Sequence, residues 1–157
     1  CLVLIFRDMA LQIYLAAPLF SAAEQNFNAR LAKAIEAKGN PVFLPQAECA
    51  QLQEIVEIYR TCREGIERSH VVVAILDGAD ADSGTCWECG YATGMGIPVI
   101  ALRTDFRQSG DVKGFNAMLY ASANTVILAE AQDDIDRQMD DLAAKIVNSL
   151  ETAIEKA

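Results

Sequence analysis

Residues 70–76 constrain the fold more than any other part of this chain. They read HVVVAIL, an almost uninterrupted run of apolar and mostly β-branched side chains. Successive side chains of a strand point to opposite faces of its sheet, so a strand that is apolar at every position buries both faces. The sequence therefore predicts a central strand covered by other elements on each side.

Shorter apolar stretches alternate with longer amphipathic ones on both sides of this strand. Strands are predicted at residues 12–16, 41–44, 70–76, 98–102 and 125–128. Helices are predicted at residues 20–38, 48–68, 84–95, 111–120 and 131–156. Repeated strand–helix alternation is typical of a parallel sheet. We therefore expect a single α/β domain of the flavodoxin-like or Rossmann-like kind over residues 9–157, with five parallel strands and helices on both faces.

Residues 1–8 are expected to lie outside this domain. Arg7 and Asp8 end their apolar run too early for the hydrophobic region of a signal peptide, and no small-residue cleavage site follows. Met9 is a more ordinary starting residue, just before the first predicted strand. We interpret residues 1–8 as an upstream segment or an added edge strand without a function.

The charge balance excludes several classes of partner. The chain carries 22 acidic and 13 basic residues, a formal net charge of −9, and an acidic surface repels nucleic acids and anionic membranes. No apolar run approaches the roughly 18 residues of a membrane span. The five cysteines are scattered and odd in number, which is typical of a reducing cytosol rather than of a disulfide framework. We expect a cytoplasmic protein that binds a small, weakly charged molecule.

Several familiar motifs are absent. The turn after the first strand, residues 16–19, reads AAPL and lacks the glycines of a dinucleotide-binding turn, and there is no phosphate-binding P-loop. A phospho-acceptor receiver domain built on Asp77 would also need acidic residues after the first strand and a lysine after the last, and the sequence has neither. The single histidine, His70, excludes Ser/His and Cys/His triads. Cys86 and Cys89 form one C-x-x-C pair, for which helix packing is favoured over metal binding or redox chemistry.

Acidic residues are concentrated after the central strand, where parallel α/β folds bind their ligands. Asp77, Asp80 and Asp82 lie in the loop, and Glu88 lies one turn into the next helix. The free amides and partial positive charge of that helix N-terminus are expected to keep Glu88 ionised. This region is the candidate site.

Two glycines flank Glu88 in the sequence of the candidate site. Gly84 and Gly90 carry no side chain, so the backbone beside them can approach a ligand closely. On the other hand, Thr85-x-x-Glu88 has the spacing of a capping box, in which Glu88 would only close its own helix end. The pattern alone leaves both interpretations open.

Three blocks of sequence resemble a known family. Residues 13–20 read IYLAAPLF, residues 82–92 read DSGTCWECGYA, and Asn116-x-Met118 follows later. In this order and spacing the blocks resemble nucleoside 2-deoxyribosyltransferases, with the resemblance extending over residues 12–128. The first two blocks lie at the ends of predicted strands, where the fold places its ligands.

The resemblance implies the exchange of the base on a 2′-deoxyribonucleoside, without a metal or other cofactor. Glu88 matches the family nucleophile that forms a covalent deoxyribosyl intermediate, and Tyr14 matches the tyrosine that holds it. The partners would be 2′-deoxyribonucleosides and free nucleobases, in nucleoside salvage. Two alternatives stay open: an N-glycosidase that uses the same nucleophile with water as acceptor, and a nucleotide-binding module without catalysis.

The resemblance also implies a set of substrate-binding residues. These are Asp82 for the sugar hydroxyls, Gly84 beside it, Ala16, Ala17 and Phe20 for the flat base, Cys62 near the base, and Asn116 with Met118. In the family the last two reach the site of a neighbouring subunit. A homo-oligomer is therefore expected.

Three features depart from the family or stay unassigned. Cys62 stands where better-known members have an aspartate that helps to protonate the base; a thiol is a poor acid near neutral pH, so Glu64 or Glu48 is a candidate substitute. Related monophosphate N-glycosidases have a serine at the position of Asp82, and a carboxylate there would repel a 5′-phosphate. Two cations, at residues 103 and 107, are expected to bind substrate, to clasp the acidic loop, or to stay solvated.

Overall fold

The computed structural model describes residues 9–105, 112–129 and 132–157. In chain order the elements are β1 (Ile13–Ala16), α1 (Ala22–Glu36), β2 (Val42–Phe43), α2 (Pro45–Glu48), α3 (Ile55–Glu67), β3 (Val71–Ile75), α4 (Ser83–Gly94), β4 (Val99–Arg103), α5 (Ala117–Ser122), β5 (Thr125–Leu128) and α6 (Ile135–Glu155). The strands form one parallel sheet in the order β2-β1-β3-β4-β5. The predicted five-stranded α/β fold is confirmed, and its strand order is the flavodoxin-like one.

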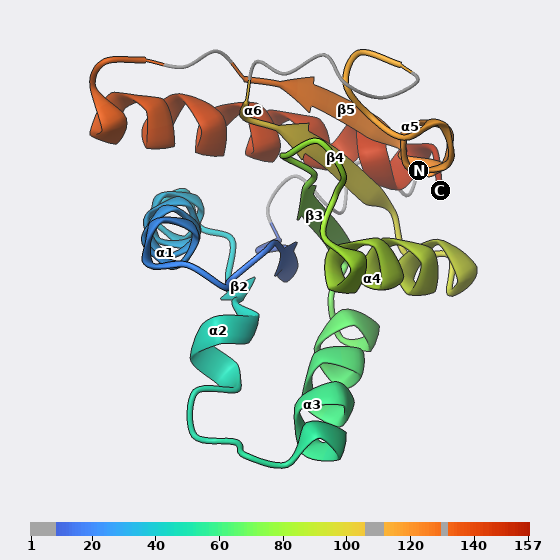
Figure 1. The fold of residues 1–157 in the computed structure, drawn as a ribbon. Helices are drawn as coiled ribbons and strands as arrows, with labels where there is room; N and C mark the ends of the chain where they lie inside the picture. Colours follow the sequence, from blue (N-terminus) through green and yellow to red (C-terminus); the bar gives the residue numbers. More distant parts are fainter. Residues whose placement is uncertain (1–8, 106–111, 130–131) are drawn as a thin grey trace.

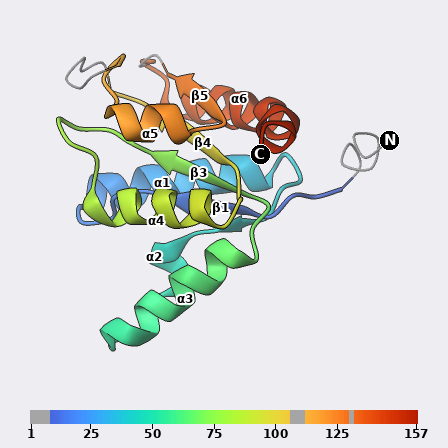
Figure 2. The same cartoon turned by 90° about the vertical axis from the view of Figure 1, so that its right-hand side faces the viewer.

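The run of apolar residues at 71–75 forms the central strand. All five residues of β3 are buried, and β3 pairs with β1 on one side and with β4 on the other. Helices α1 and α6 cover one face of the sheet, while α3, α4 and α5 lie on the other (Figures 1 and 2). The alternation along β1 sends Ile13 and Leu15 into the first layer and Tyr14 and Ala16 into the second. The side of β1 that carries Tyr14 and Ala16 therefore faces α3 and α4.

The predicted single helix over residues 48–68 is wrong. The fixed φ of Pro45 suits the first turn of a helix, so α2 begins at residue 45 and ends after one turn. Residues 49–54 then reverse the chain, with a turn bond of 3.0 Å from the Leu52 amide to the Cys49 carbonyl. Figure 1 shows α2 and α3 as two separate arms joined by this connection. The reversal brings the end of α2 back against α3.

Two other helices begin later than predicted. Lys113 and Gly114 have φ angles of 49° and 86°, which a right-handed helix does not accommodate. Helix α5 therefore begins at Ala117 rather than at residue 111, which lies outside the described residues. Asp134 caps α6, which begins at Ile135 rather than at residue 131, also outside the described residues. The other predicted boundaries differ from the observed ones by at most a few residues.

Residues 1–8 also lie outside the described residues, so their interpretation as an upstream segment or edge strand stays a prediction. In the part of the chain that the structure describes, no helix has the length and apolar character needed to cross a membrane.

Gly65 sets the distance between α3 and the sheet. A Cβ atom built on Gly65 would lie 2.6 Å from the ring of Phe43 in β2. That ring in turn stacks on Tyr14 of β1, with 5.1 Å between the ring centroids and 11° between the planes. Because the glycine lets the Phe43 ring press against α3, it also fixes the position of Tyr14.

Replacing Gly65 by alanine tests this packing. We expect Gly65→Ala to lower the free energy of unfolding by about 1–3 kcal/mol, because the Phe43 ring must move away from the new methyl group. Gly94→Ala is the control: its Cβ meets nothing within 4 Å, and alanine favours a helix over glycine by up to about 1 kcal/mol. Urea unfolding followed by circular dichroism measures both. Equal effects of the two substitutions would contradict the packing role.

Candidate active site

A hydrogen bond from Tyr14 to Glu88 joins β1 to α4. The Tyr14 hydroxyl donates to Glu88 Oε1 over 2.5 Å, although the two residues are 74 positions apart in the chain. Helix α4 packs against β1 in the second layer of the core, which brings residues of the strand beside the helix. Both predicted catalytic residues are thus in direct contact.

Packing on several sides surrounds the Tyr14 side chain. Its side chain is fully buried among residues of the second layer, which include Ala16, Val72 and Cys89. One face of its ring stacks on Phe43. Burial, together with the nearby Glu88 carboxylate, raises the pKa of Tyr14 far above its ordinary value, so the hydroxyl keeps its proton and remains a donor.

The capping-box interpretation of Glu88 is wrong. The cap of α4 is Asp82, whose Oδ2 accepts from the Thr85 amide at 2.9 Å and from the Thr85 hydroxyl at 3.2 Å. Glu88 is turned away from this end and bonds to Tyr14 instead. A Cβ on Gly84 would lie 3.1 Å from the same Asp82 oxygen, so the glycine gives the cap its room. Asp82 therefore has a structural role whatever else it binds.

The environment of Glu88 favours its protonated form. Burial raises the pKa of Glu88 to about 7; the hydrogen bond from Tyr14 opposes this rise, and the nearby Asp82 carboxylate adds to it. This rise in pKa runs against the expectation that the helix N-terminus keeps Glu88 ionised. A carboxyl group that titrates near neutral pH and is fixed by one donor suits a nucleophile or an acid–base group.

Cys62 lies beside the Tyr14 hydroxyl, on α3. Each of these two groups affects the pKa of the other, so the hydroxyl has two neighbouring groups, Glu88 and Cys62. Burial raises the pKa of the Cys62 thiol to about 12, against the effect of the Tyr14 hydrogen bond. The thiol therefore does not supply protons near pH 7. Of the suggested substitutes, Glu64 forms an ion pair with Arg68 at 2.8 Å, and Glu48 lies at the end of α2.

The predicted base-binding residues occupy the carboxyl end of β1 and the turn after it. Ala16 and Ala17 are buried, and Phe20 is 77% exposed just before the capped start of α1. Phe20 alone would have been interpreted as a core residue at the start of a helix; its exposure contradicts that. A cavity of about 290 Å³ opens next to this turn, lined by Leu19, Gln25, Pro45, Gln46, Cys49, Ala50, Ile58 and Cys62. Cys62 therefore borders this cavity and also lies near the Tyr14–Glu88 pair.

Asn116 and Met118 lie at the start of α5. The Asn116 side chain accepts from the Met118 amide at 2.9 Å and so caps the helix. Asn116 also lines a separate cavity of about 240 Å³ together with Asp80 and Arg103. Met118 is 77% exposed.

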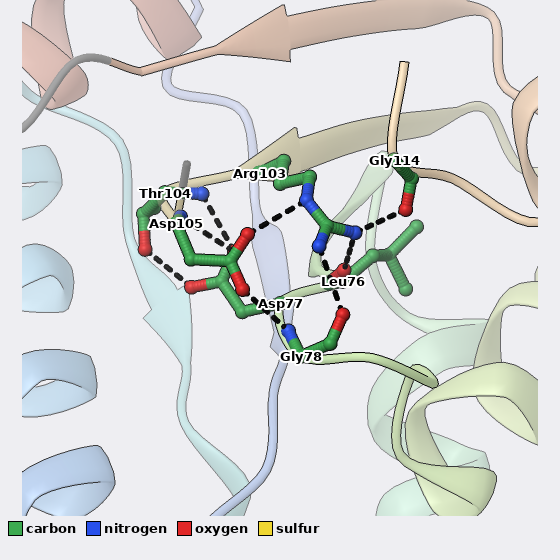
Figure 3. Close-up of polar contacts among 7 residues, drawn as sticks. All are labelled: Leu76, Asp77, Gly78, Arg103, Thr104, Asp105 and Gly114. Atoms are coloured by element: carbon green, nitrogen blue, oxygen red, sulfur yellow. Dashed lines mark hydrogen bonds and ion pairs between the residues drawn. The ribbon is translucent and has the colours of Figure 1, made fainter. Parts of the chain in front are cut away.

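Arg103 ties together the loops that follow β3 and β4 (Figure 3). It is the last residue of β4 and is buried. Its guanidinium donates to the carbonyls of Leu76, Gly78 and Gly114 and forms an ion pair with Asp105, Nε to Oδ1, at 2.7 Å. Among the alternatives for this cation, the clasp on the acidic loop is the one observed. Arg107 lies outside the described residues.

Asp77 supports the same junction from the other loop (Figure 3). Its carboxylate accepts from the Thr104 amide at 2.6 Å and from the Thr104 hydroxyl, and Asp105 accepts from the Gly78 amide at 2.9 Å. Each of the two loops therefore accepts hydrogen bonds from the other. This fixes the loop that leads to Asp82 and the turn that leads to Asn116.

The remaining polar candidates have ordinary structural partners. His70 accepts from the Gln12 amide through Nδ1 at 2.9 Å. Cys89 is buried, and Cys86 directs its thiol to the Ala81 carbonyl at 3.7 Å. Within residues 9–105, 112–129 and 132–157, no group of three or more His, Cys, Asp or Glu side chains is arranged to hold a metal ion.

Two residues of the site had no signal in the sequence. Phe43 supports Tyr14 only because β1 and β2 pair with Tyr14 opposite Phe43, and register is not visible in a two-residue strand. Cys49 approaches Cys62 only because residues 49–54 reverse the chain, with 3.7 Å between the two sulfurs. Both depend on contacts between elements rather than on a local pattern.

Comparison with known proteins identifies the family model and the solved structures that the chain resembles. A family model described as nucleoside 2-deoxyribosyltransferase matches residues 13–127. No curated protein matches the chain. Among solved structures, a conserved protein from Enterococcus faecalis V583 is 27% identical, with a TM-score of 0.68, over 89% of this chain and 99% of that chain.

Two further structures share the fold. The 2-deoxyribosyltransferase from Bacillus psychrosaccharolyticus is 24% identical, with a TM-score of 0.63, over 88% of this chain and 95% of that chain. The CMP N-glycosidase BcmB from Clostridium botulinum is 18% identical, with a TM-score of 0.59, over 85% of this chain and 98% of that chain. At these identities the likeness extends to the fold alone.

Removing the Arg103 guanidinium tests the junction of the two loops. We expect Arg103→Met to lower the free energy of unfolding by about 3–5 kcal/mol, because it leaves Asp105 and three carbonyls without their buried donor. Arg137→Met is the control, since Arg137 is 76% exposed and meets Asp141 at 3.9 Å; such a surface pair contributes at most about 1 kcal/mol. Urea unfolding at pH 7 measures both. A loss below 1 kcal/mol for Arg103→Met would contradict the clasp.

Proposed function

The chain belongs to the nucleoside 2-deoxyribosyltransferase family, and from this membership we propose that it transfers the 2-deoxyribosyl group of a 2′-deoxyribonucleoside between nucleobases, in nucleoside salvage. The observation that carries the proposal is the 2.5 Å hydrogen bond from Tyr14 to Glu88. It fixes one oxygen of a partly buried carboxyl group and leaves the other for reaction. A nucleophile of this kind needs to be close, ionised and motionless when it attacks.

The proposed reaction is a double displacement at C1′. Glu88 Oε2 attacks C1′ of the deoxyribose, and the bond between C1′ and the base nitrogen breaks with its electron pair going to the base. The base takes up a proton and leaves, while the sugar stays bound to Glu88 as an ester. A nitrogen of a second base then attacks C1′ from the vacated face, releases the Glu88 carboxylate and loses its proton. Two inversions give net retention, as in retaining glycosidases.

The proton for the leaving base is proposed to come from solvent. The Cys62 thiol has a pKa of about 12 and keeps its proton near pH 7, and the Glu64 carboxylate is engaged with Arg68. Bases that are readily protonated in water, such as purines, are therefore the proposed donors. The exposed position of the turn around Phe20 supports access of water to this side of the site.

Asp82 is proposed to bind the sugar hydroxyls. One of its oxygens, Oδ2, accepts from Thr85, and the other is assigned to the substrate. Gly84 leaves room for the sugar beside it, and Ala16, Ala17 and Phe20 form the slot for the flat base. Because a carboxylate repels a phosphate dianion, the proposed substrate carries no 5′-phosphate.

We also propose a homo-oligomer in which Asn116 and Met118 serve the site of a neighbouring subunit. Both lie at the start of α5; Asn116 lines a cavity that Glu88 does not border, and Met118 is exposed. A group of large apolar side chains on α3 and α4 is exposed as well: Ile55, Val56, Tyr59 and Trp87, at 82%, 64%, 48% and 44%. An apolar surface of this kind supports association with a second copy.

Mixing two inactive variants tests the shared site. We expect Glu88→Ala and Asn116→Ala to be inactive alone, and a refolded equimolar mixture to recover up to about a quarter of the wild-type rate. The mixed oligomer contains sites with an intact Glu88 from one subunit and an intact Asn116 from its neighbour. Doubling the amount of either variant alone is the control. No recovery, although the mixture forms mixed oligomers on a gel, would contradict the proposal.

Two other functions remain as candidates. The fold shared with the Clostridium botulinum CMP N-glycosidase supports a hydrolase in which water replaces the second base, with the same Glu88 nucleophile. A binding module that holds a nucleotide without reaction would use the same cavity. The assay below separates all three.

Chromatography of products from deoxyinosine, with and without adenine, tests the transfer. We expect deoxyadenosine only when adenine is present, and a loss of at least about 10³-fold for Glu88→Ala, because alanine removes the proposed nucleophile. Glu36→Ala, an exposed carboxylate on α1, is the control and should retain full activity. Deoxyinosine 5′-monophosphate as donor should react more slowly than deoxyinosine.

The other outcomes of this assay are equally informative. Hypoxanthine and free deoxyribose at equal rates with and without adenine would indicate a hydrolase. No product with deoxyinosine, thymidine or a deoxynucleoside monophosphate, together with unchanged ligand affinity in Glu88→Ala, would indicate the binding module.

The pH dependence of kcat/KM tests the state of Glu88. The group must be ionised to attack and loses its proton as the pH rises through about 7, so kcat/KM should fall about tenfold per unit below that pH. Tyr14→Phe removes the hydrogen bond that lowers the pKa and should move the midpoint upward by about one unit. Tyr91→Phe, which removes a second 2.5 Å bond from a tyrosine to a glutamate, Glu67, should leave the midpoint near 7. A profile that is flat from pH 5 to 9 would contradict the role of Glu88.

A further inference from the structure

Two cysteine sulfurs are in contact beside the candidate site. Cys49 Sγ and Cys62 Sγ are 3.7 Å apart, and both side chains are partly exposed. They come from different elements, since Cys49 caps the end of α2 and Cys62 lies in the middle of α3. Cys62 follows Cys49 by thirteen positions, and the chain reverses at residues 49–54 within this interval.

The surroundings allow this pair to react. Both cysteines line the cavity of about 290 Å³ next to the turn after β1, so a small oxidant reaches them from solvent. A disulfide bond is about 2.05 Å long, and the two sulfurs therefore need to approach by roughly 1.7 Å. Cys49 begins an irregular connection, held by turn bonds rather than by a continuous helix, and this connection can move without breaking α3.

We propose that Cys49 and Cys62 are a redox-active pair, which a hydroperoxide converts to a disulfide and a dithiol reductant restores, and that the disulfide slows the reaction at Glu88. In the first step the Cys49 sulfur attacks the peroxide and its O–O bond breaks, which gives a sulfenic acid and one water or alcohol. The Cys62 sulfur then attacks the Cys49 sulfur, releases water and forms the S–S bond. The two thiols lose two electrons in total, and the peroxide gains them.

The effect on the site follows because Cys62 neighbours Tyr14 as well as Cys49. Its thiol is near enough to the Tyr14 hydroxyl for each group to affect the pKa of the other, and that hydroxyl holds Glu88. A disulfide draws the Cys62 sulfur toward Cys49 and away from this hydroxyl. It also narrows the cavity that the two cysteines share. Because misplacement by about 1 Å can cost up to about 10²-fold in rate, we expect a loss of about tenfold in transfer.

Peptide mapping after oxidation tests the pair directly. The full chain is treated with hydrogen peroxide, free thiols are alkylated, and the digest is analysed by mass spectrometry. We expect a cross-linked pair of peptides that contain Cys49 and Cys62, two hydrogens lighter than their reduced sum, which disappears with dithiothreitol. Cys86 and Cys89 are the internal control and should be recovered alkylated. Since burial holds the pKa of the Cys62 thiol at about 12, the cross-link should form faster at pH 9 than at pH 7.

Activity before and after peroxide completes the test. We expect the wild-type rate to fall about tenfold and to recover with dithiothreitol, while the rate of Cys49→Ser stays within twofold of its own untreated value. Cys86→Ser is the matched control and should respond as the wild type does. Thermal melting of each variant checks that it is folded.

Each outcome decides a separate point. Recovery of Cys49 and Cys62 as alkylated thiols after peroxide would overturn the pair, and a complete cross-link with an unchanged rate would overturn its effect on the site. Only that effect rests on the proposed function. An untreated protein without activity would contradict the proposed function, while the peptide map would still decide whether the pair forms.

Discussion

A single hydrogen bond between a buried tyrosine and a half-buried glutamate is the interaction on which the site depends. Tyr14 sits on the first strand and Glu88 on the helix after the third, so the contact exists only when β1 and β3 are paired and α4 is packed on the sheet. Ionised Glu88 is disfavoured by burial and stabilised by this one donor. The folded state thus keeps a carboxyl group in an environment that costs stability when it is charged. Such a cost is expected where the charge is used in a reaction.

The rest of the structure keeps the partners of this bond in place. Gly65 lets Phe43 lie close to α3, and Phe43 supports the ring of Tyr14. On the other side of the sheet end, Arg103 joins the loops after β3 and β4 through three carbonyls and one carboxylate. A guanidinium is suited to this because its donors point in several fixed directions in one plane. The loop that carries Asp82 is therefore held at its base although it is open to solvent further along.

The fold was predictable because its signals are local and periodic. A strand that is apolar at every position, as at residues 71–75, has to be central, and alternation of strands with helices leaves few topologies. The prediction failed where the chain must reverse within an amphipathic stretch. Residues 48–68 have one continuous helical pattern, yet Pro45 starts a separate turn and residues 49–54 turn back. Helix α5 starts late because Lys113 and Gly114 have positive φ angles. A lysine rarely adopts a positive φ, so its residue type did not predict this conformation.

The sequence by itself determined the class of fold, the loops that carry the site and, through the family resemblance, the pairing of Tyr14 with Glu88. The fold class and these loops depend on residue type and spacing along the chain, while the pairing is what the family resemblance implies. Only the tertiary structure decided that Asp82 rather than Glu88 caps α4, that Arg103 is a buried clasp, and that Cys49 meets Cys62. It also raises the pKa of Glu88 to about 7, since burial excludes water from around the carboxyl group. Burial and contacts between distant segments arise from packing, and no local pattern records them.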